Sequence, residues 1–462
     1  MYECPNCGGN LKFDITLQML KCDYCLTTQN PYEVTKDKDA EESAPFDVTI
    51  FTCPQCGGEI LSTDTSAAEF CSFCGASTIL DSRISKEKRP VKIIPFKQTK
   101  EACKKAYTDR LKRAIFAPDE LKDEKYIDSF RGIYMPYWTY HITQQGGVEM
   151  KGKKTFRKGD YVYTDHYELG GNLDAYYKEL SYDASASFAD NISERIAPFN
   201  VKDMQPFTPS YLSGFYADTA DVDSSLYEED AKTVANTASF SRIKKDAAFS
   251  GIQFTSKENN SSAGFMLHTY LAPVERVMFP VWFMSYRKGD RIAYATVNGQ
   301  TGKVAADIPV DIKKYVTGSL ILAVPIFILL NLFFTIKATY SLIISAILAA
   351  ATLILYGLEM NKISRWENRE EDRGYHLRKK RTNSKKSNNQ SGISGFIGSL
   401  LAVVIAVCIL VFSPISDIWY YGGSIAAFIG ILFTTTSLIK KYNILATRKL
   451  PQFDRKGGND HA

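Results

Sequence analysis

Two long stretches of this chain contain almost no charged residues. The chain has 462 residues, with 56 Lys and Arg and 51 Asp and Glu, yet residues 318–358 hold only Lys337. Residues 393–439 hold only Asp417. A helix needs about 20 apolar residues to cross a bilayer, and each stretch is about twice that long. We therefore predict two transmembrane hairpins with four spans: Ser319–Ile336, Ala338–Leu358, Ile393–Phe412 and Gly422–Ile439.

This charge pattern excludes several classes of protein. A wholly soluble enzyme would not carry two such stretches, and a small secreted disulfide domain would be far shorter. A disordered chain would not be 45% hydrophobic.

The predicted spans favour an anchor over a transport path. None has an ionisable residue in its interior, and Asn331 is their only amide, whereas transport sites usually contain buried ionisable groups. Small residues that let helix backbones approach recur at every fourth position of the third and fourth spans: Ser394, Gly398, Ala402, Ala406, Gly422, Ala426, Gly430 and Thr434. We expect a packed anchoring bundle, with a transporter or channel as the alternative.

The basic residues lie beside the predicted spans and indicate their orientation. The loop at 359–392 has ten Lys and Arg against five acids, and the tail at 440–462 has six against two. The first 358 residues therefore carry a net charge of −3. By the positive-inside bias, the loop and the tail are cytoplasmic, and four spans place the N-terminus there too. No signal peptide is expected, and the basic loop could contact anionic lipid.

Eight of the ten cysteines form four Cys-x-x-Cys pairs, and the arrangement repeats with an offset of 49 residues. Two such turns joined by a hairpin place four thiolates around one tetrahedral Zn²⁺ ion. Disulfides do not suit a chain with no export signal in a reducing compartment. We predict two zinc ribbons, at 1–30 and 50–80, joined by a linker at 31–49 and each holding one structural Zn²⁺. The predicted ligands are Cys4, Cys7, Cys22, Cys25, Cys53, Cys56, Cys71 and Cys74.

The charges of the two ribbons favour a protein partner over nucleic acid. The first ribbon has a net charge of −1, and the second has no Lys or Arg and a net charge of −3. Nucleic-acid affinity depends largely on Lys and Arg that neutralise phosphates, and these ribbons have almost none.

Residues 90–310 are predicted to form a cytosolic α+β domain. We expect helices at 97–115 and 226–249 from their periodicity. Strands are expected from Gly132 to Asn172 as a meander, and again from Gly251 to Pro309. The predicted turns are Gly146-Gly147, Lys158-Gly159-Asp160, Lys288-Gly289-Asp290 and Asn298-Gly299-Gln300. The segments 134–138 and 278–282 are similar, which suggests two related β-rich subdomains.

No catalytic motif is recognisable, and we expect no enzyme activity. The segment Gly299–Val304 lacks the first-glycine spacing and the Ser or Thr of a phosphate-binding loop, so a strand turn is the better interpretation. His141, His166 and His268 are scattered without the spacing of a triad or a metal site. Cys103 and Cys408 are expected to behave as small apolar residues.

The order of five segments resembles a known family. They are the motifs CPNCGG and CPQCGG, Phe130–Trp138, Pro209–Phe215, Phe279–Trp282 and Val297–Lys303. Taken together with the C-terminal spans, they resemble the bacterial membrane proteins that carry N-terminal TFIIB-type zinc ribbons. The resemblance covers roughly residues 1–310. Members are often labelled helicase-like, but this chain has no nucleotide-binding motif.

The resemblance implies a place and a partner. Some relatives are encoded beside homologues of phage-shock protein A and are thought to hold such peripheral proteins at the bilayer during envelope stress. We therefore expect a scaffold that docks protein partners at the cytoplasmic face of the bacterial membrane. A membrane-tethered nucleic-acid-binding regulator, or a subunit of a transporter or membrane enzyme, are the alternatives.

Overall fold

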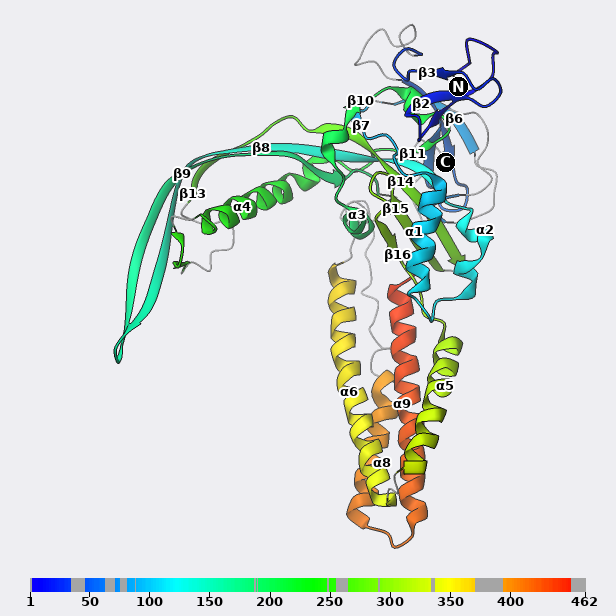
Figure 1. Cartoon of the computed structure of the whole chain (residues 1–462), viewed down its shortest axis with the longest axis vertical. Helices are drawn as coiled ribbons and strands as arrows, with labels where there is room; N and C mark the ends of the chain where they lie inside the picture. Colours follow the sequence, from blue (N-terminus) through cyan, green and yellow to red (C-terminus); the bar gives the residue numbers. More distant parts are fainter. Residues whose placement is uncertain are drawn as a thin grey trace, which may run out of the picture.

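The computed structural model describes residues 2–34, 46–62, 71–74, 81–87, 89–186, 188, 190–246, 249–254, 265–289, 291–333, 337–369 and 394–449. It has three parts, which Figure 1 shows. A head of β-sheets lies above a stem of long helices, and a curved β-hairpin arm extends sideways from the head. Most of the predicted basic loop, from residue 370 to 392, lies outside the described residues.

The first cysteine-rich segment forms a small sheet of its own. Its three antiparallel strands are β1 (Leu11–Asp14), β2 (Met19–Cys22) and β3 (Thr28–Gln29). The second cysteine-rich segment instead belongs to the main sheet, in which β5 (Glu59–Ser62) pairs with β4 (Phe46–Thr52) and with β11 (Tyr216–Ala217). The two ribbons therefore differ in how they connect to the head.

The main sheet has fourteen strands, with the order β10-β7-β14-β8-β11-β5-β4-β6 along its path. Its remaining strands are β6 (Asp81–Glu87), β7 (Lys92–Ile93), β8 (Arg131–Lys158), β9 (Tyr161–Asp183), β10 (Gln205–Pro206), β12 (Gln253–Phe254), β13 (Phe265–Leu271), β14 (Glu275–Lys288), β15 (Arg291–Asn298), β16 (Val304–Ala306) and β17 (Arg448–Lys449). A central domain of strands and helices is therefore confirmed.

The two similar segments lie side by side in one sheet. β14 pairs antiparallel with β8, so that Pro280 lies opposite Tyr134 and Met278 lies opposite Pro136. The prediction of two β-rich subdomains is therefore wrong. The similarity reflects two neighbouring strands that share one core, because both place aromatic and aliphatic side chains on the same pair of buried faces.

The predicted meander is instead one long hairpin of β8 and β9. The turn at Lys158-Gly159 is confirmed, and Gly159 has a φ of +64°. The predicted turn at Gly146-Gly147 is wrong, since both glycines lie within β8. Strands pair with them on both edges, β9 on one side and β13 on the other, and these ladders keep the backbone extended.

The two long helices of the head match the predicted positions at 97–115 and 226–249, and two short helices were not predicted. The four are α1 (Lys100–Lys112), α2 (Glu124–Ile127), α3 (Asp190–Ile196) and α4 (Glu228–Lys244). The side chain of Thr99 caps α1 by accepting from the Ala102 amide. α1 buries Cys103, Tyr107 and Leu111 against the sheet, and α4 lies along the arm (Figure 1).

Four helices form the stem at the predicted positions. They are α5 (Ile312–Phe333), α6 (Ala338–Arg369), α8 (Ile397–Phe412) and α9 (Asp417–Leu445). Within the described residues, two stretches are long and apolar enough to cross a membrane, Ala338–Asn361 and Asp417–Ile444, while α8 is shorter. Two apolar helices long enough to cross a membrane are therefore confirmed, whereas the described residues do not show the four predicted spans.

Small residues allow α8 and α9 to pack closely. A Cβ added to Gly398 would lie 2.7 Å from the carbonyl oxygen of Gly430, so neither position has room for a side chain. The hydroxyl of Ser399 lies 2.9 Å from that of Thr434 and is buried. The predicted stripe is correct for Gly398, Gly430 and Thr434, whereas Gly422 is exposed.

Candidate metal centres

The eight predicted cysteines gather into two clusters. In each cluster the four Sγ atoms lie within 4.8 Å of one another. The first cluster is Cys4, Cys7, Cys22 and Cys25, and the second is Cys53, Cys56, Cys71 and Cys74. No histidine joins either cluster among the described residues.

The spacing of the sulfur atoms suits a tetrahedral ion and excludes disulfides. The Sγ atoms of Cys4 and Cys25 lie 3.5 Å apart, and those of Cys56 and Cys71 lie 3.7 Å apart. Four sulfurs about 2.3 Å from a central zinc would lie about 3.8 Å from one another. A disulfide would need about 2.05 Å. Both clusters can therefore hold a metal ion that prefers thiolate ligands.

The first pair of each cluster sits on a tight turn that a glycine closes. The amide of Gly8 donates to the carbonyl of Cys4 over 2.8 Å, and Gly57 donates to Cys53 over 2.8 Å. Gly8 has a φ of +71° and Gly57 a φ of +75°, a backbone conformation that favours glycine. The two CxxCGG motifs therefore fold in the same way.

The second cluster is wholly buried in the main sheet. All four of its cysteines pack with Phe51, Ile60 and Phe73. The hydroxyl of Tyr294, from β15, donates to the carbonyl of Phe73 over 2.7 Å. Because Tyr294 lies far along the chain, this bond connects the cluster to the centre of the head.

The first cluster lies at the surface, where Cys7 is exposed and Cys25 is half-buried. Its small sheet docks on Pro209–Phe215, a segment already prominent in the sequence. The amide of Phe13 donates to the carbonyl of Ser213 over 3.0 Å, and the Ser213 hydroxyl donates to the carbonyl of Leu11 over 2.5 Å. The ring of Phe13 packs edge-on against Tyr211, with centroids 5.1 Å apart.

The ionisation of the clustered thiols also suits a cation. In the second cluster, hydrogen bonds with Cys56 and then Cys71 hold the pKa of Cys53 well below its usual range. The thiol of Cys53 in turn raises the pKa of Cys56 and of Cys71. Cys53 thus ionises more readily than Cys56 and Cys71, and a bound cation would favour the thiolate form of every ligand.

In the first cluster, too, the pKa of one thiol is lowered and that of another is raised. The hydrogen bond with the Thr27 hydroxyl lowers the pKa of Cys25 to about 6. The backbone hydrogen bond from Gly9 lowers the pKa of Cys7, but contacts with Cys25 and Cys22 outweigh it and raise that pKa to about 12.

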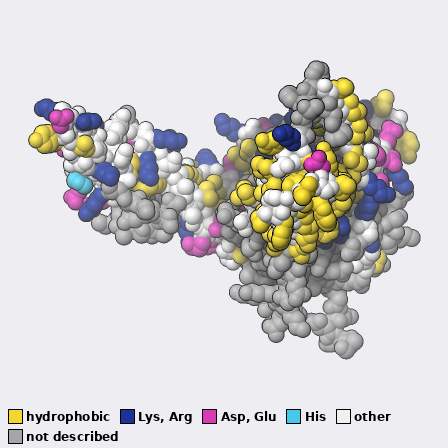
Figure 2. All heavy atoms as spheres, turned by 90° about the horizontal axis from the view of Figure 1, so that it is seen from below, with side chains coloured by type: hydrophobic (Ala, Val, Ile, Leu, Met, Phe, Trp, Pro, Cys, Tyr) yellow, Lys and Arg dark blue, Asp and Glu magenta, His cyan; other side chains and the backbone are white. Residues whose placement is uncertain are grey.

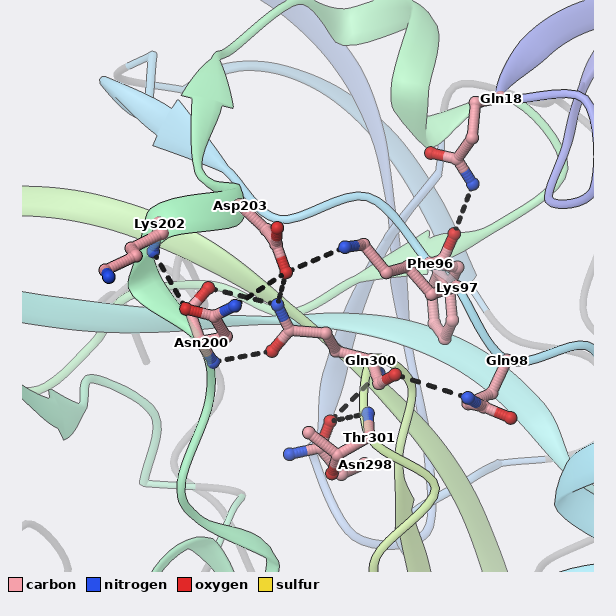
Figure 3. Close-up of polar contacts among 10 residues, drawn as sticks. All are labelled: Gln18, Phe96, Lys97, Gln98, Asn200, Lys202, Asp203, Asn298, Gln300 and Thr301. Carbon is pink, nitrogen blue, oxygen red and sulfur yellow. Dashed lines mark hydrogen bonds and ion pairs between the residues drawn. The ribbon is translucent and has the colours of Figure 1, made fainter.

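The segment that superficially resembles a phosphate-binding loop is a structural turn between β15 and β16 (Figure 3). The side-chain oxygen of Asn298 accepts from the amides of Gln300 and Thr301, each over 2.9 Å. Gln300 donates to Asp203, which also pairs with Lys97 over 2.7 Å. These side chains bond to one another, so the strand-turn interpretation is confirmed.

The remaining candidate residues lie apart from both clusters. The Nε2 atom of His141 lies 4.0 Å from Oε2 of Glu275, while His166 and His268 are exposed on the arm. Burial raises the pKa of Cys103, and Cys408 is exposed on α8. These five residues share no common site.

Sequence reasoning missed the joint between the head and the stem. The side chain of Asn443, near the end of α9, bonds to both the amide and the carbonyl of Val310 over 2.7 Å. Arg291 donates to Thr447 Oγ1 over 2.6 Å and to the carbonyl of Ile444. β17 then pairs with β15. Side-chain hydrogen bonds and strand pairing thus connect the head to α9. The residues involved are far apart in the sequence, and the fold brings them together.

Comparison with known proteins gives one informative match. The chain is 26% identical over 315 residues to the uncharacterized protein YdjG of Bacillus subtilis (strain 168). The matched region covers 67% of this chain and 90% of YdjG. No family model and no solved structure matches the chain.

Proposed function

We propose that this protein is a membrane-anchored, zinc-binding scaffold that docks protein partners at the cytoplasmic face of a bacterial membrane. The observation that carries the proposal is the placement of the two cysteine clusters. They lie in the head, remote from the far end of the apolar stem, and the first of them stays at the surface (Figure 1).

Zinc is the ion proposed for both clusters. Four cysteine sulfurs at tetrahedral spacing form a closed ligand set, which is typical of structural zinc and leaves no position open for a substrate. Each cluster would hold one ion, with Cys4, Cys7, Cys22 and Cys25 around the first.

The exterior of the stem supports the proposed anchoring through four spans. Most of the exposed large apolar side chains of the described residues lie on α5, α6, α8 and α9. Figure 2 shows them gathered in yellow over the end of the stem. Water would penalise so large an apolar surface, whereas hydrocarbon would not. The basic residues of 359–392 and 440–462 support the proposed cytoplasmic position of the head.

The first cluster offers the docking surface. Tyr24 and Leu26, on the loop that carries Cys25, are 80% and 64% exposed. Large exposed apolar side chains beside an acidic ribbon suit a protein partner rather than nucleic acid. A peripheral membrane protein like phage-shock protein A is the partner proposed, from the family resemblance. No catalytic role is proposed for any residue.

Affinity purification from membranes tests this function. The double variant Tyr24→Ser, Leu26→Ser removes both exposed side chains and keeps all eight cysteines, and we expect it to lose the co-purifying partner. Tyr270→Ser is the matched control, because Tyr270 is 65% exposed on the arm. An identical partner set for the double variant and the control would overturn the proposed docking surface.

A further inference from the structure

The arm continues beyond the elements that support it. β13 pairs with β8 as far as Val148, and β12 pairs with it at Gly152 and Lys153. Among the described residues, only β8 and β9 pair with each other from Lys154 to Asp165, joined by the turn at Gly159. A two-stranded hairpin is only marginally stable in water by itself, so we expect a further contact to stabilise its exposed faces. We name residues 154–165 the hairpin tip.

One face of the arm carries aromatic side chains beyond the end of its cover. Val148 and Met150 are buried with Phe240 of α4. Alternate residues of a strand share a face, so beyond Gly152 and the Lys154–Asp165 pair the same face presents Phe156 on β8 and its partner Tyr163 on β9. Their rings stack with centroids 5.7 Å apart. Nothing described covers them, because α4 ends at Lys244 and its packing stops short of the tip.

The tip has four exposed large apolar side chains within one short segment. Phe156 is 43% exposed, Tyr161 73% and Tyr163 47%, and Val162 is also exposed. These four residues lie within eight positions of the chain. Elsewhere among the described residues outside the stem, such side chains are spread over several loops and strands.

Basic residues lie on both faces of the hairpin near these rings: Lys154 and Lys158 share the face of Phe156, and the others lie on the opposite face. From residue 151 to 168 there are five Lys and Arg against three acids, for a net charge of +2. The basic residues are Lys151, Lys153, Lys154, Arg157 and Lys158. Lysines along the strands of an open hairpin disfavour edge-to-edge pairing with another chain. Aromatic rings flanked by basic side chains are instead typical of segments that lie at a membrane surface.

The arm bends downward, in the direction in which the stem extends from the head (Figure 1). In Figure 1 it leaves the head sideways and then curves down, and its tip lies level with the upper part of the helices. Figure 2, seen from below, shows the tip far to one side of the stem, with apolar, basic and acidic side chains at its end. A bilayer around the stem would therefore extend beneath the tip.

We propose that the hairpin tip inserts its aromatic face among the headgroups of the cytoplasmic leaflet, where its lysines and Arg157 meet anionic lipids. This inference rests on the proposed anchoring of the stem. The tip is a second contact with the membrane, at a distance from the helices, and it fixes the orientation of the head over the bilayer.

Site-specific photo-crosslinking of the full chain tests the proposal. Tyr161, Phe428 and Tyr24 are each replaced, one at a time, by p-benzoylphenylalanine, and the protein is reconstituted in vesicles of phosphatidylethanolamine and phosphatidylglycerol. Phe428 is 52% exposed on α9 and reports on anchoring, while Tyr24 reports on the remote surface of the head. After irradiation, mass spectrometry identifies the adducts. We expect lipid adducts at Tyr161 and Phe428, at least about tenfold above those at Tyr24.

Each other result counts against the proposal in a different way. Lipid adducts at Phe428 alone overturn the tip contact and leave the anchoring intact, and adducts at neither position overturn both. An adduct of Tyr161 with a second copy or another protein assigns the tip to that partner instead. The variant Lys154→Glu, Lys158→Glu should lower the lipid adducts at Tyr161 by at least about fivefold, and an unchanged yield overturns the role of charge.

Discussion

The first cysteine cluster lies at the surface on its own small sheet, whereas the second lies inside the main sheet. Both have the same ligand spacing and the same glycine-closed turn at their first pair. Their surroundings differ, since Cys7 is exposed and all four cysteines of the second cluster are buried. The CxxCGG motif thus determines how the four thiols of a cluster converge. The neighbouring strands determine which part of the molecule a bound metal would stabilise.

The same motif would therefore stabilise the main sheet in one place and a separate small sheet in the other. The strands of the second cluster pair with β11, and so with the centre of the head. Its metal would therefore hold the head together. The first cluster touches the head mainly through the segment Pro209–Phe215, so its metal would hold only a docking module.

The largest expected effect is the loss of the buried centre. Structural zinc can supply about 10 kcal/mol or more to folding, which is comparable to the whole stability of a domain. Cys71→Ser should therefore lower the yield of folded, membrane-extracted protein by at least about tenfold, measured by size-exclusion chromatography in detergent. Cys408→Ser is the control, because Cys408 is exposed on α8. A normal yield of Cys71→Ser would show that the buried centre does not hold the head together.

Loss of the exposed centre should have a smaller and more local effect. Cys25→Ser should reduce the zinc content from two ions per chain to one, measured by atomic emission. Proteases should then cut within residues 2–34, while the part from β4 onward stays resistant. If the whole head became sensitive, the contrast between the two centres would be wrong.

Docking of the first ribbon can be weakened without touching its ligands. Phe13→Ala removes the ring that packs on Tyr211 and should cost about 3 kcal/mol of docking free energy. Hydrogen exchange at the Phe13 amide, which bonds to Ser213, should become at least about tenfold faster, with zinc retained. Phe156→Ala at the exposed tip is the matched control. Loss of zinc from Phe13→Ala would show that docking and metal binding are one process.

Local patterns of the sequence predicted the local features of the structure. The spacing of Cys4 and Cys7 indicated a shared ion, and the periodicity of 226–249 indicated α4. Both depend on residues a few positions apart, which chain geometry alone brings together. The predicted turn at Gly146-Gly147 failed because pairing on both edges of β8 outweighs the flexibility of glycine.

Features that depend on distant residues could not be predicted. The pairing of Tyr216 with Ser62, which joins the second ribbon to the main sheet, leaves no repeat or periodicity in the sequence. Neither does the contact of Asn443 with Val310. Such pairings depend on the whole fold, so one sequence cannot distinguish an independent ribbon from one built into a sheet.

The smallest expected effect concerns the turn itself. Gly8 has a φ of +71°, and a Cβ added there would meet nothing within 4 Å, so Gly8→Ala introduces backbone strain without a clash. A strain of about 1 kcal/mol should speed zinc release to a chelator by about fivefold. Gly159→Ala is the matched control, because Gly159 has a φ of +64° and equal space at the hairpin tip, far from either centre. If both variants released zinc at the same rate, strain at the turn would not control the exposed centre. A faster release confined to Gly8→Ala would instead show that this turn holds its ligands in place without help from the main sheet.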